Sequence, residues 1–592
     1  MPNEVKANRR IRALAIMCVA LMVVFVIRLF YLQVIRHDYY VTKARQEQEK
    51  RLVIPAQRGE IYLLDDGKPV KVVMNQTVYT MFVDPSIVDK PDQVLKAIRE
   101  VVGGNTVKGY ADRIEKKDTR YQVVARQVTH TQAELIRKRS LKGVGFQAES
   151  ARIYPEKSLA AQTLGFVNFD GIGQYGVEGK FDKALQGTDG LLQSVTDVAN
   201  VPLTIGDKNI DIEPKNGQNI VLTIDRSVQS YVEQALADGM KQKGADGASA
   251  IVMDPNNGHI IAMANLPTYD PSEISKIQNF AQVNNGVVAS PYEPGSVMKT
   301  FTLATGIDMG VVKPDSTYVN TDYIKVDDRV ISNASKGQTG TITLQHALNW
   351  SLNTGMVTVA QRLGTNNTID YKARSTMYSY LHDRFRLGQL TGIEVNGESE
   401  GRIISPKEAE GNAVRYSNMS FGQGMDLTMV QVAAGFSAMI NGGTYYTPTV
   451  LAGTIGADGE LKPEKDRPAY PGVIKSSTSE QMRGMITTAR KAFYAAKDRK
   501  GYEVGGKTGT SQTLVNGSYE NGQTVATYLG YGGDTKPKYV IMVQVSGKNK
   551  NFAGNKDANP IFTDISNWMI DYLKLQPCLL YTSPSPRDRQ KS

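Results

Sequence analysis

The sequence predicts an α+β fold in three parts: an N-terminal transmembrane helix, a mixed α/β region, and a domain in which helices cover an antiparallel sheet. Three observations support this prediction. A long apolar run lies near the N-terminus, short strand-like and helix-like segments are mixed up to residue 214, and two pairs of strand-like segments enclose long helices within residues 215–577. Helices that bury one face against a sheet give such a domain its core.

The apolar run near the N-terminus is long enough to cross a bilayer. Residues 13–27 are apolar without interruption, and apolar character resumes after Arg28 and continues to Ile35. A span needs about 20 apolar residues, and no small-residue cleavage site follows this one. Residues 13–35 are therefore expected to be an uncleaved anchor. Basic residues flank it on both sides, so the charge pattern leaves its orientation open.

Composition and charge narrow the classes of function. A chain of 592 residues predicts two or three domains. The formal net charge of +10 includes no long basic run, which favours an anionic envelope surface over nucleic-acid recognition. Cys18 lies in the apolar run and Cys578 begins the segment CLLYTSPSPRDRQKS, so no intrachain disulfide is expected. Residues 578–592 are interpreted as a non-native tail translated from a sequencing adapter, with a disordered native tail as the alternative.

The region from residue 36 to residue 214 shows mixed secondary structure and no internal repeat. RLVIPAQRGEIYLLDDGKPV predicts strands around an Asp-Asp-Gly turn, and PDQVLKAIREVV and HTQAELIRKRSL predict amphipathic helices. GIGQYG, residues 171–176, matches a dinucleotide-binding loop, but no alternating βαβ series surrounds it, so a structural turn is favoured. DIEPKNG, residues 211–217, is expected to be a linker.

The following domain, residues 215–577, is expected to be built on paired strands. NIVLTID predicts a strand followed by a helix over residues 227–242, and ASAIVMD and HIIAMAN predict a hairpin around Pro-Asn-Asn-Gly. TVATYLGY and KYVIMVQV predict two more strands, and IFTDISNWMIDYL predicts a closing amphipathic helix. Long helices between these strand pairs would cover the sheet.

The segment GYEVGGKTGTSQ, residues 501–512, matches two different motifs. G-x-x-x-x-G-K-T is a phosphate-binding loop, and K-T-G is a substrate-binding strand of enzymes that acylate a serine. A phosphate loop needs a strand before its glycines and a helix after them. KAFYAAKDRK, before the segment, is helix-like, and the glycines and asparagines after it would break a helix. The K-T-G interpretation is therefore favoured, and no nucleotide is expected.

A serine and a lysine with helical spacing are candidates for nucleophilic catalysis. In PYEPGSVMKTFTLATGIDMG, a helix is predicted from Ser296 to about Gly310, and Lys299 lies one turn after Ser296 on the same face. A serine alcohol needs a base, and a lysine serves as one if desolvation and a second cation lower its pKa. Lys507 is a candidate for that cation. The alternative is an ordinary surface Ser/Lys pair.

A third motif makes the catalytic interpretation more specific. Ser351 and Asn353 form S-x-N at a predicted break between two helical stretches, where the alternative is a helix N-cap. The order S-x-x-K, S-x-N, K-T-G within one domain is far more specific than any of the three alone.

With these motifs the chain resembles the penicillin-binding transpeptidases and serine β-lactamases. The anchor, the segment RGEI at residues 58–61, GQYGVE at residues 173–178 and FGQG at residues 421–424 are similar to the class B, monofunctional members, and YEPGS is similar to the division-specific, FtsI-like branch. The sequence departs from the family's Asp-Arg-x-Gly pattern at residues 62–67, YLLDDG, which concerns the non-catalytic region.

The resemblance implies a serine-type D-Ala-D-Ala transpeptidase. Ser296 would attack the carbonyl between the two terminal D-alanines of a peptidoglycan stem peptide and form an acyl-enzyme. Lys299 would be the acylation base, and Ser351 would relay a proton to the leaving amine. The amine of a second stem peptide would then resolve the ester, and β-lactams would acylate the same serine.

The resemblance also assigns residues to substrate binding. Asn353 would hold the peptide amide of the substrate. Lys507, Thr508 and Thr510 would bind the terminal carboxylate on the K-T-G strand that includes Gly509, and the backbone amides of Ser296 and Thr510 would form the oxyanion hole. No metal and no cofactor is expected.

The same resemblance implies an architecture and partners. Residues 1–12 would be a cytoplasmic tail, residues 36–214 an elongated pedestal of the class B dimerisation type, and residues 215–577 an extracytoplasmic transpeptidase domain. A membrane glycosyltransferase of the FtsW-like type and other division proteins would be partners in septal cell-wall synthesis. Two alternatives remain open: a β-lactamase or D,D-carboxypeptidase on the same fold, and a catalytically silent division scaffold.

Overall fold

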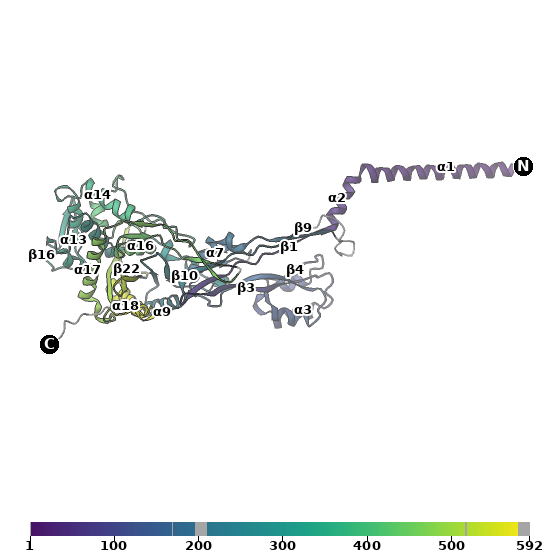
Figure 1. Ribbon diagram of the computed structural model, residues 1–592. Coiled ribbons are helices and arrows are strands. Elements are labelled where there is room, and N and C mark those ends of the chain that lie inside the picture. Colours follow the sequence, from purple (N-terminus) through teal and green to yellow (C-terminus); the bar gives the residue numbers. More distant parts are fainter. Residues whose placement is uncertain (1, 169, 196–209, 457, 516–517, 578–592) are drawn as a thin grey trace, which may run out of the picture. The chain divides into compact units, whose positions relative to one another are not determined.

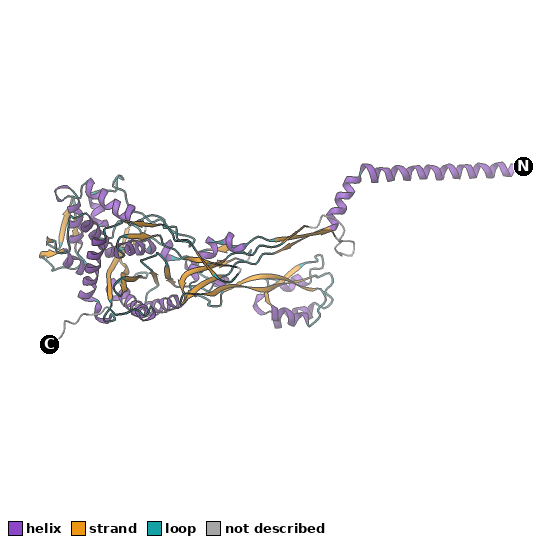
Figure 2. Cartoon of the chain, in the orientation of Figure 1, coloured by secondary structure: helices purple, strands orange, loops and turns teal. Residues whose placement is uncertain are grey.

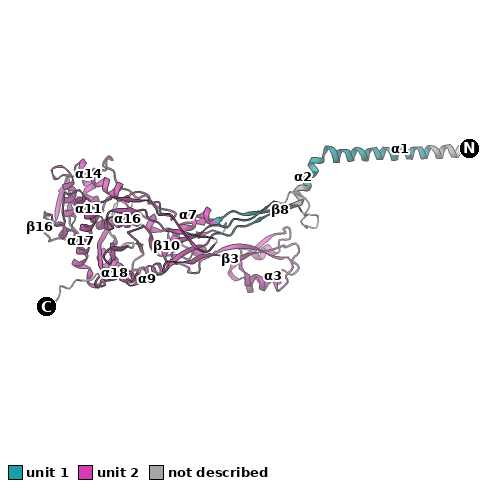
Figure 3. Ribbon diagram, in the orientation of Figure 1, with its two compact units in different colours: residues 1–58, 186–217 teal, residues 59–185, 218–592 magenta. Residues whose placement is uncertain are grey.

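The computed structural model describes residues 2–168, 170–195, 210–456, 458–515 and 518–577, which divide into two compact units (Figures 1 and 3). Unit 1 comprises residues 1–58 and 186–217, and unit 2 comprises residues 59–185 and 218–592. The interpretation of residues 578–592 lies outside the described residues, and the domain limits expected from the sequence stay predictions.

Unit 1 contains the predicted membrane anchor. Helix α1 (Pro2–Phe30) continues through the π-helical turn η1 (Tyr31–Ile35) and is followed by α2 (His37–Gln48). The stretch Arg9–Ile35 is exposed, helical and apolar enough to cross a membrane. Three antiparallel strands complete the unit: β1 (Glu49–Ile54), β8 (Gly190–Val195) and β9 (Ile210–Ile212). The linker expected at residues 211–217 therefore begins within a strand.

A five-stranded antiparallel sheet forms the centre of unit 2 (Figure 2). Its strand order is β12-β11-β23-β22-β21. The bounds of these strands are β11 Gly247–Met253, β12 Ile260–Leu266, β21 Glu503–Val515, β22 Ser518–Gly533 and β23 Pro537–Ser546. The hairpin of β11 and β12 and the strands near the end of the domain confirm the strand predictions.

Helices cover both faces of this sheet because its side chains alternate between two cores. Ala250 and Val252 pack with α9 (Arg226–Lys243) and α18 (Asn559–Tyr572), while Ile251 and Met253 face the larger core that includes α16 (Met429–Ile440). All residues of α16 are buried. Helix α17 (Ser476–Phe493) packs on β21, and α11 (Lys299–Asp308) lies among α13 (Asn353–Leu363), α16 and α17. The predicted α+β fold is confirmed.

A second sheet of seven strands joins segments far apart in the sequence. Its order is β19-β18-β10-β2-β3-β4, with β5 paired to β3, and β10 runs parallel to β2. The bounds are β2 Ile61–Asp65, β3 Lys68–Val83, β4 Gln122–Thr129, β5 Val144–Ile153, β10 Asn219–Asp225, β18 Leu451–Ile455 and β19 Leu461–Pro463. The predicted amphipathic helices are α3 (Pro91–Val101) and α5 (His130–Arg137), which pack in a core with β3 and β4.

Short elements complete the part of unit 2 that carries the S-x-N motif. Helix α12 (Leu344–Asn349) ends just before it, and α13 (Asn353–Leu363) begins within it. Two hairpins flank these helices: β13 (Thr317–Asn320) with β16 (Gly340–Thr343), and β14 (Tyr323–Val326) with β15 (Arg329–Ser332). GIGQYG forms a turn around the two-residue strand β7 (Gly173–Gln174), followed by α7 (Gly176–Lys180).

Candidate active site

Ser296 lies in a tight turn at the start of a buried helix. The turn is the 3-10 segment η5 (Gly295–Met298), and Lys299 is the first residue of α11. The helix expected from Ser296 thus begins one turn later as a regular α-helix. Gly295 adopts a positive φ of 63°, and its N–H donates to the carbonyl of Gly422 at 3.0 Å. This hydrogen bond and the positive φ set the direction of the turn that carries the serine.

Three close backbone approaches hold this turn in place. A Cβ on Gly295 would lie 2.7 Å from the carbonyl oxygen of Thr510, and one on Gly422 would lie 1.9 Å from the carbonyl oxygen of Gly295. A Cβ on Gly509 would lie 2.9 Å from the carbonyl oxygen of Pro294. The turn is therefore packed between strand β21 and the FGQG loop, and only glycine fits at the contact points.

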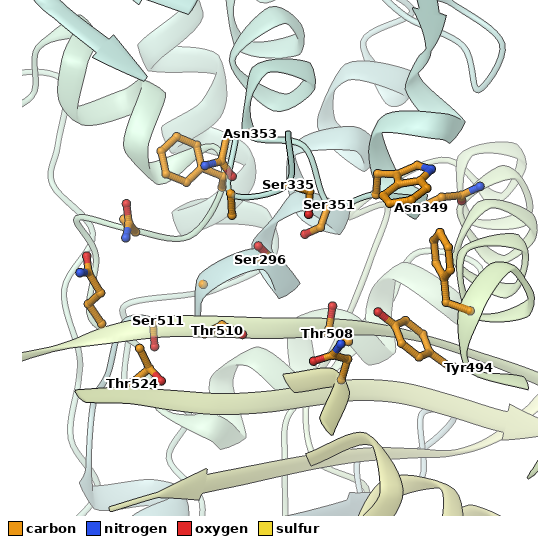
Figure 4. A pocket seen from close by; sticks show the side chains of 18 residues that line it. Ser296, Ser335, Asn349, Ser351, Asn353, Tyr494, Thr508, Thr510, Ser511 and Thr524 are labelled. Carbon is orange, nitrogen blue, oxygen red and sulfur yellow. The ribbon is translucent and has the colours of Figure 1, made fainter. Parts of the chain in front are cut away.

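The hydroxyl of Ser351 lies between two lysines. Lys299 Nζ donates to the backbone carbonyl of Ser351 at 2.5 Å and to its Oγ at 3.2 Å, and Lys507 Nζ donates to the same Oγ at 2.9 Å. Ser351 has a positive φ of 58° between α12 and α13, which is rare for a serine. Figure 4 shows Ser351 and Ser296 facing the same cleft. The structure thus brings together residues from all three motifs.

Burial lowers the pKa of both lysines. The side chain of Lys299 is completely buried, and Lys507 is 4% exposed. Burial, with the charge of the neighbouring Lys507, lowers the pKa of Lys299 well below its usual value. Burial also lowers the pKa of Lys507 to about 7. Only an unprotonated lysine accepts a proton from a hydroxyl, as a general base must, and a lowered pKa favours that form.

The remaining candidates lie around the cleft. Asn353 lines it, and its Nδ2 donates to the carbonyl of Ser332 in β15 at 2.9 Å. Thr508 and Thr510 line it from β21, and Thr510 Oγ1 accepts a hydrogen bond from the N–H of Gly554 at 3.2 Å. Lys299, Lys507 and Gly509 are not among the described residues that line the cleft, but both lysines reach it through the hydroxyl of Ser351. Gly509 allows the strand to approach the nucleophile turn.

The cleft has a volume of 710 Å³ and includes residues that the motifs did not single out. Figure 4 shows Tyr494 at one end of the cleft and Ser511 and Thr524 at the other. Trp350 and Phe493 also line the cleft and adjoin Tyr494 through ring contacts, and Gln512 follows Ser511. Trp350 directly precedes Ser351, and Phe493 and Tyr494 lie in the helical segment before the K-T-G strand. Their sequence positions do not show that they reach the cleft, because the two segments meet only in the folded domain.

A buried ionic network supports β22, the strand that pairs with the K-T-G strand. Arg490 of α17 is fully buried, and its guanidinium pairs with Asp498 at 2.5 Å. It also donates to the hydroxyl of Tyr528 at 2.6 Å and to Thr563 Oγ1 at 2.9 Å. A buried cation with this many partners fixes helix and strand relative to each other.

Comparisons with known proteins agree with this arrangement. Residues 248–567 match the family described as penicillin binding protein transpeptidase domain, and residues 53–222 match the penicillin-binding protein dimerisation domain. The chain is 30% identical to stage V sporulation protein D of Bacillus subtilis over 588 residues. This alignment covers 97% of this chain and 87% of that protein. It is 25% identical over 567 residues to peptidoglycan D,D-transpeptidase FtsI of Buchnera aphidicola, covering 94% of both. The crystal structure of penicillin binding protein 2X from Streptococcus thermophilus superposes with a TM-score of 0.69 at 23% identity, over 89% of this chain and 80% of that one.

Proposed function

The chain belongs to the penicillin-binding protein transpeptidase family, as a class B member, and we propose that it crosslinks peptidoglycan through an acyl-enzyme on Ser296. Peptidoglycan D,D-transpeptidation and penicillin binding are the activities of this class. One observation carries the assignment of the mechanism to these residues. The hydroxyl of Ser351 is hydrogen-bonded to both Lys299 and Lys507 at the cleft that Ser296 lines.

Acylation uses the neutral lysine. Ser296 Oγ attacks the carbonyl carbon between the two terminal D-alanines while its proton passes to Lys299 Nζ. The new C–O bond forms, the peptide C–N bond breaks, and Ser351 relays the proton from Lys299 to the leaving amine. The backbone amides of Ser296 and Thr510 stabilise the oxyanion of the tetrahedral intermediate. The lowered pKa of Lys299 supports this role, because a protonated lysine could not accept the proton.

Substrate binding uses the strand and the S-x-N loop. Lys507, Thr508 and Thr510 hold the terminal carboxylate, and Asn353 holds the peptide amide. The amine of a second stem peptide then attacks the ester and forms the crosslink, whereas a β-lactam leaves the serine acylated. None of the described residues that line the cleft is an aspartate or a glutamate, which favours transpeptidation over a hydrolase that needs a carboxylate for deacylation.

The proposed cellular setting is the cytoplasmic membrane. The apolar helix Arg9–Ile35, which is long enough to cross a membrane, supports it. Because peptidoglycan is made outside this membrane, we propose that the catalytic domain lies outside and residues 1–12 inside. Residues 36–214 act as the pedestal, and an FtsW-like glycosyltransferase supplies glycan strands during septal synthesis. The relative named FtsI supports the division role, while the relative named for sporulation leaves a second setting to be tested.

The test is labelling of the full chain in detergent with a fluorescent penicillin, followed by mass spectrometry of the adduct over time. We expect one long-lived adduct on Ser296, absent in Ser296→Ala and retained in Ser335→Ala, a matched serine that lines the same cleft. A rapid return of free enzyme with hydrolysed penicillin would instead assign a β-lactamase. A folded chain that forms no adduct would assign a silent scaffold.

A further inference from the structure

One end of the cleft presents an exposed aromatic surface. Trp350 and Phe493 are 36% and 45% exposed, and their rings meet edge to face with centroids 5.0 Å apart. Tyr494 follows, with its ring centroid 5.9 Å from that of Phe493. Trp350 comes from the end of α12 and the other two from the end of α17. Adjacent exposed aromatic rings inside a cleft indicate a surface that a ligand covers.

Strand β21 gives the cleft a direction. Thr508, Thr510, Ser511 and Gln512 follow one another along it and line the cleft. Figure 4 shows Tyr494 beside Thr508 at one end, Ser511 and Thr524 at the other, and Ser296 between them. The aromatic surface therefore lies beyond Thr508, on the side away from Ser511.

The direction of the cleft assigns the two substrates to its two ends. In the proposed reaction the carboxylate of the leaving D-alanine is held by Lys507, Thr508 and Thr510, the part of β21 that precedes Ser511. The rest of the donor peptide must then extend past Thr510 toward Ser511. Aminolysis of the acyl-enzyme is the chemical reverse of acylation, with a different amine. The acceptor amine therefore approaches the acyl carbon along the path by which the amine of D-alanine departed. The acceptor therefore enters over the aromatic end.

We propose that Trp350, Phe493 and Tyr494 form the acceptor subsite, which takes a primary amine carried on a methylene side chain of a second stem peptide. This inference rests on the proposed function. The aromatic faces bury the methylene groups, and they exclude water that would otherwise hydrolyse the ester. No aspartate or glutamate is among the described residues lining the cleft, so an entering amine is desolvated without a carboxylate to keep it protonated.

The transfer step balances without a further reactant. The bound ammonium releases one proton to solvent and becomes the neutral nucleophile. Its nitrogen attacks the ester carbonyl, the C–N bond forms, and the C–O bond to Ser296 breaks. The second proton of the amine passes to Ser296 Oγ through Lys299, which restores the free enzyme.

The experiment measures how the acyl-enzyme divides between amine and water. The full chain in detergent receives an N-acyl-D-alanyl thioester donor with either Nα-acetyl-L-lysine, a long acceptor, or D-alanine, a short one. Products of aminolysis and hydrolysis are quantified by mass spectrometry. The variants are Trp350→Ala, Phe493→Ala and Trp350→Phe, with Tyr371→Ala as the control, because Tyr371 is a comparably exposed aromatic residue outside the cleft, at 52% exposure.

We expect each alanine variant at the aromatic end to lower the aminolysis-to-hydrolysis ratio about tenfold with the lysine acceptor. The ratio with D-alanine, penicillin acylation, and all values for Trp350→Phe and Tyr371→Ala should stay within about twofold of wild type. An unchanged ratio with the lysine acceptor, or equal losses with both acceptors, would overturn the proposal. If Trp350→Ala and Phe493→Ala lost penicillin acylation while the wild type kept it, the acceptor-subsite proposal would also be overturned. If the wild-type chain itself were not acylated by penicillin, the proposed function would be refuted.

Discussion

Replacing Gly422 by alanine should displace the nucleophile turn and slow acylation strongly. Gly422 has a φ of 94°, and the added Cβ would lie 1.9 Å from the carbonyl oxygen of Gly295. Real Cβ atoms keep at least 3.0 Å, so the two backbones must separate by the difference, about 1.1 Å. A misplacement of about 1 Å at a reacting centre costs roughly a hundredfold in rate. We therefore expect the second-order rate constant of acylation by a fluorescent penicillin to fall about a hundredfold.

Backbone strain alone must be separated from this displacement. An alanine forced to positive φ costs about 1–2 kcal/mol wherever it is placed. Gly442→Ala is the matched control, because Gly442 has a φ of 104° and no heavy atom within 4 Å of the added Cβ. Both variants should lose stability in thermal unfolding, but only Gly422→Ala should lose acylation. Equal acylation rates in the two folded variants would refute the reasoning from the 1.9 Å contact.

Three further substitutions test the groups around the nucleophile. Lys507→Ala removes a positive charge that lowers the pKa of Lys299, so that pKa should rise. Acylation requires neutral Lys299 and therefore increases as pH rises through this pKa, so the acid limb of the pH–rate profile should move to higher pH. Ser351→Ala removes the proposed proton relay and should lower the penicillin acylation rate by about 10²–10⁴-fold, measured in single turnover. Arg490→Ala leaves Asp498 without its buried partner and should lower the free energy of unfolding by about 3–5 kcal/mol in chemical denaturation.

Each of these substitutions has a matched control in the chain. Lys556→Ala removes an exposed lysine near the cleft and should leave the pH profile unchanged. Ser335→Ala removes another cleft serine and should acylate normally. Arg499→Ala breaks an exposed pair with Asp571 and should cost at most about 1 kcal/mol. An acid limb of the pH–rate profile that stays in place in Lys507→Ala would contradict the pKa argument. Full acylation by Ser351→Ala would contradict the proton relay. Equal losses of unfolding free energy in Arg490→Ala and Arg499→Ala would contradict the role of the buried ion pair.

Local pattern predicted much of the fold and part of the site. The alternation in KYVIMVQV predicts β23 because successive residues face different cores, and the spacing of Ser296 and Lys299 depends on a single helical turn. The contact of Lys299 with Ser351 joins residues 52 positions apart, and that of Lys507 with Ser351 joins residues 156 apart. Contacts between residues so far apart in the sequence are set by packing of the whole domain. The catalytic roles of these residues stay a prediction.

The parts that sequence reasoning missed depend on the same kind of distant contact. Nothing local indicates that β2 pairs in parallel with β10, or that β18 pairs with β10 in the same sheet. The aromatic end of the cleft has the same origin, because Trp350 and Phe493 lie on different helices. A single exposed aromatic residue at the end of a helix does not indicate a binding site. A functional interpretation arises only because the ends of α12 and α17 meet beside Ser351 in the folded domain.

The glycines of the K-T-G segment illustrate how one pattern of letters serves two physical needs. In a phosphate loop, glycines free backbone amides to surround an anion. Here Gly505 and Gly506 lie within strand β21, where an added Cβ would meet the rings of Tyr531 at 2.5 Å and Tyr528 at 2.4 Å. These tyrosines lie on the paired strand β22 and belong to the cores on opposite faces of the sheet. The glycines thus allow both rings to pack against β21, and this packing holds the strand that carries Lys507 to the Ser351 hydroxyl.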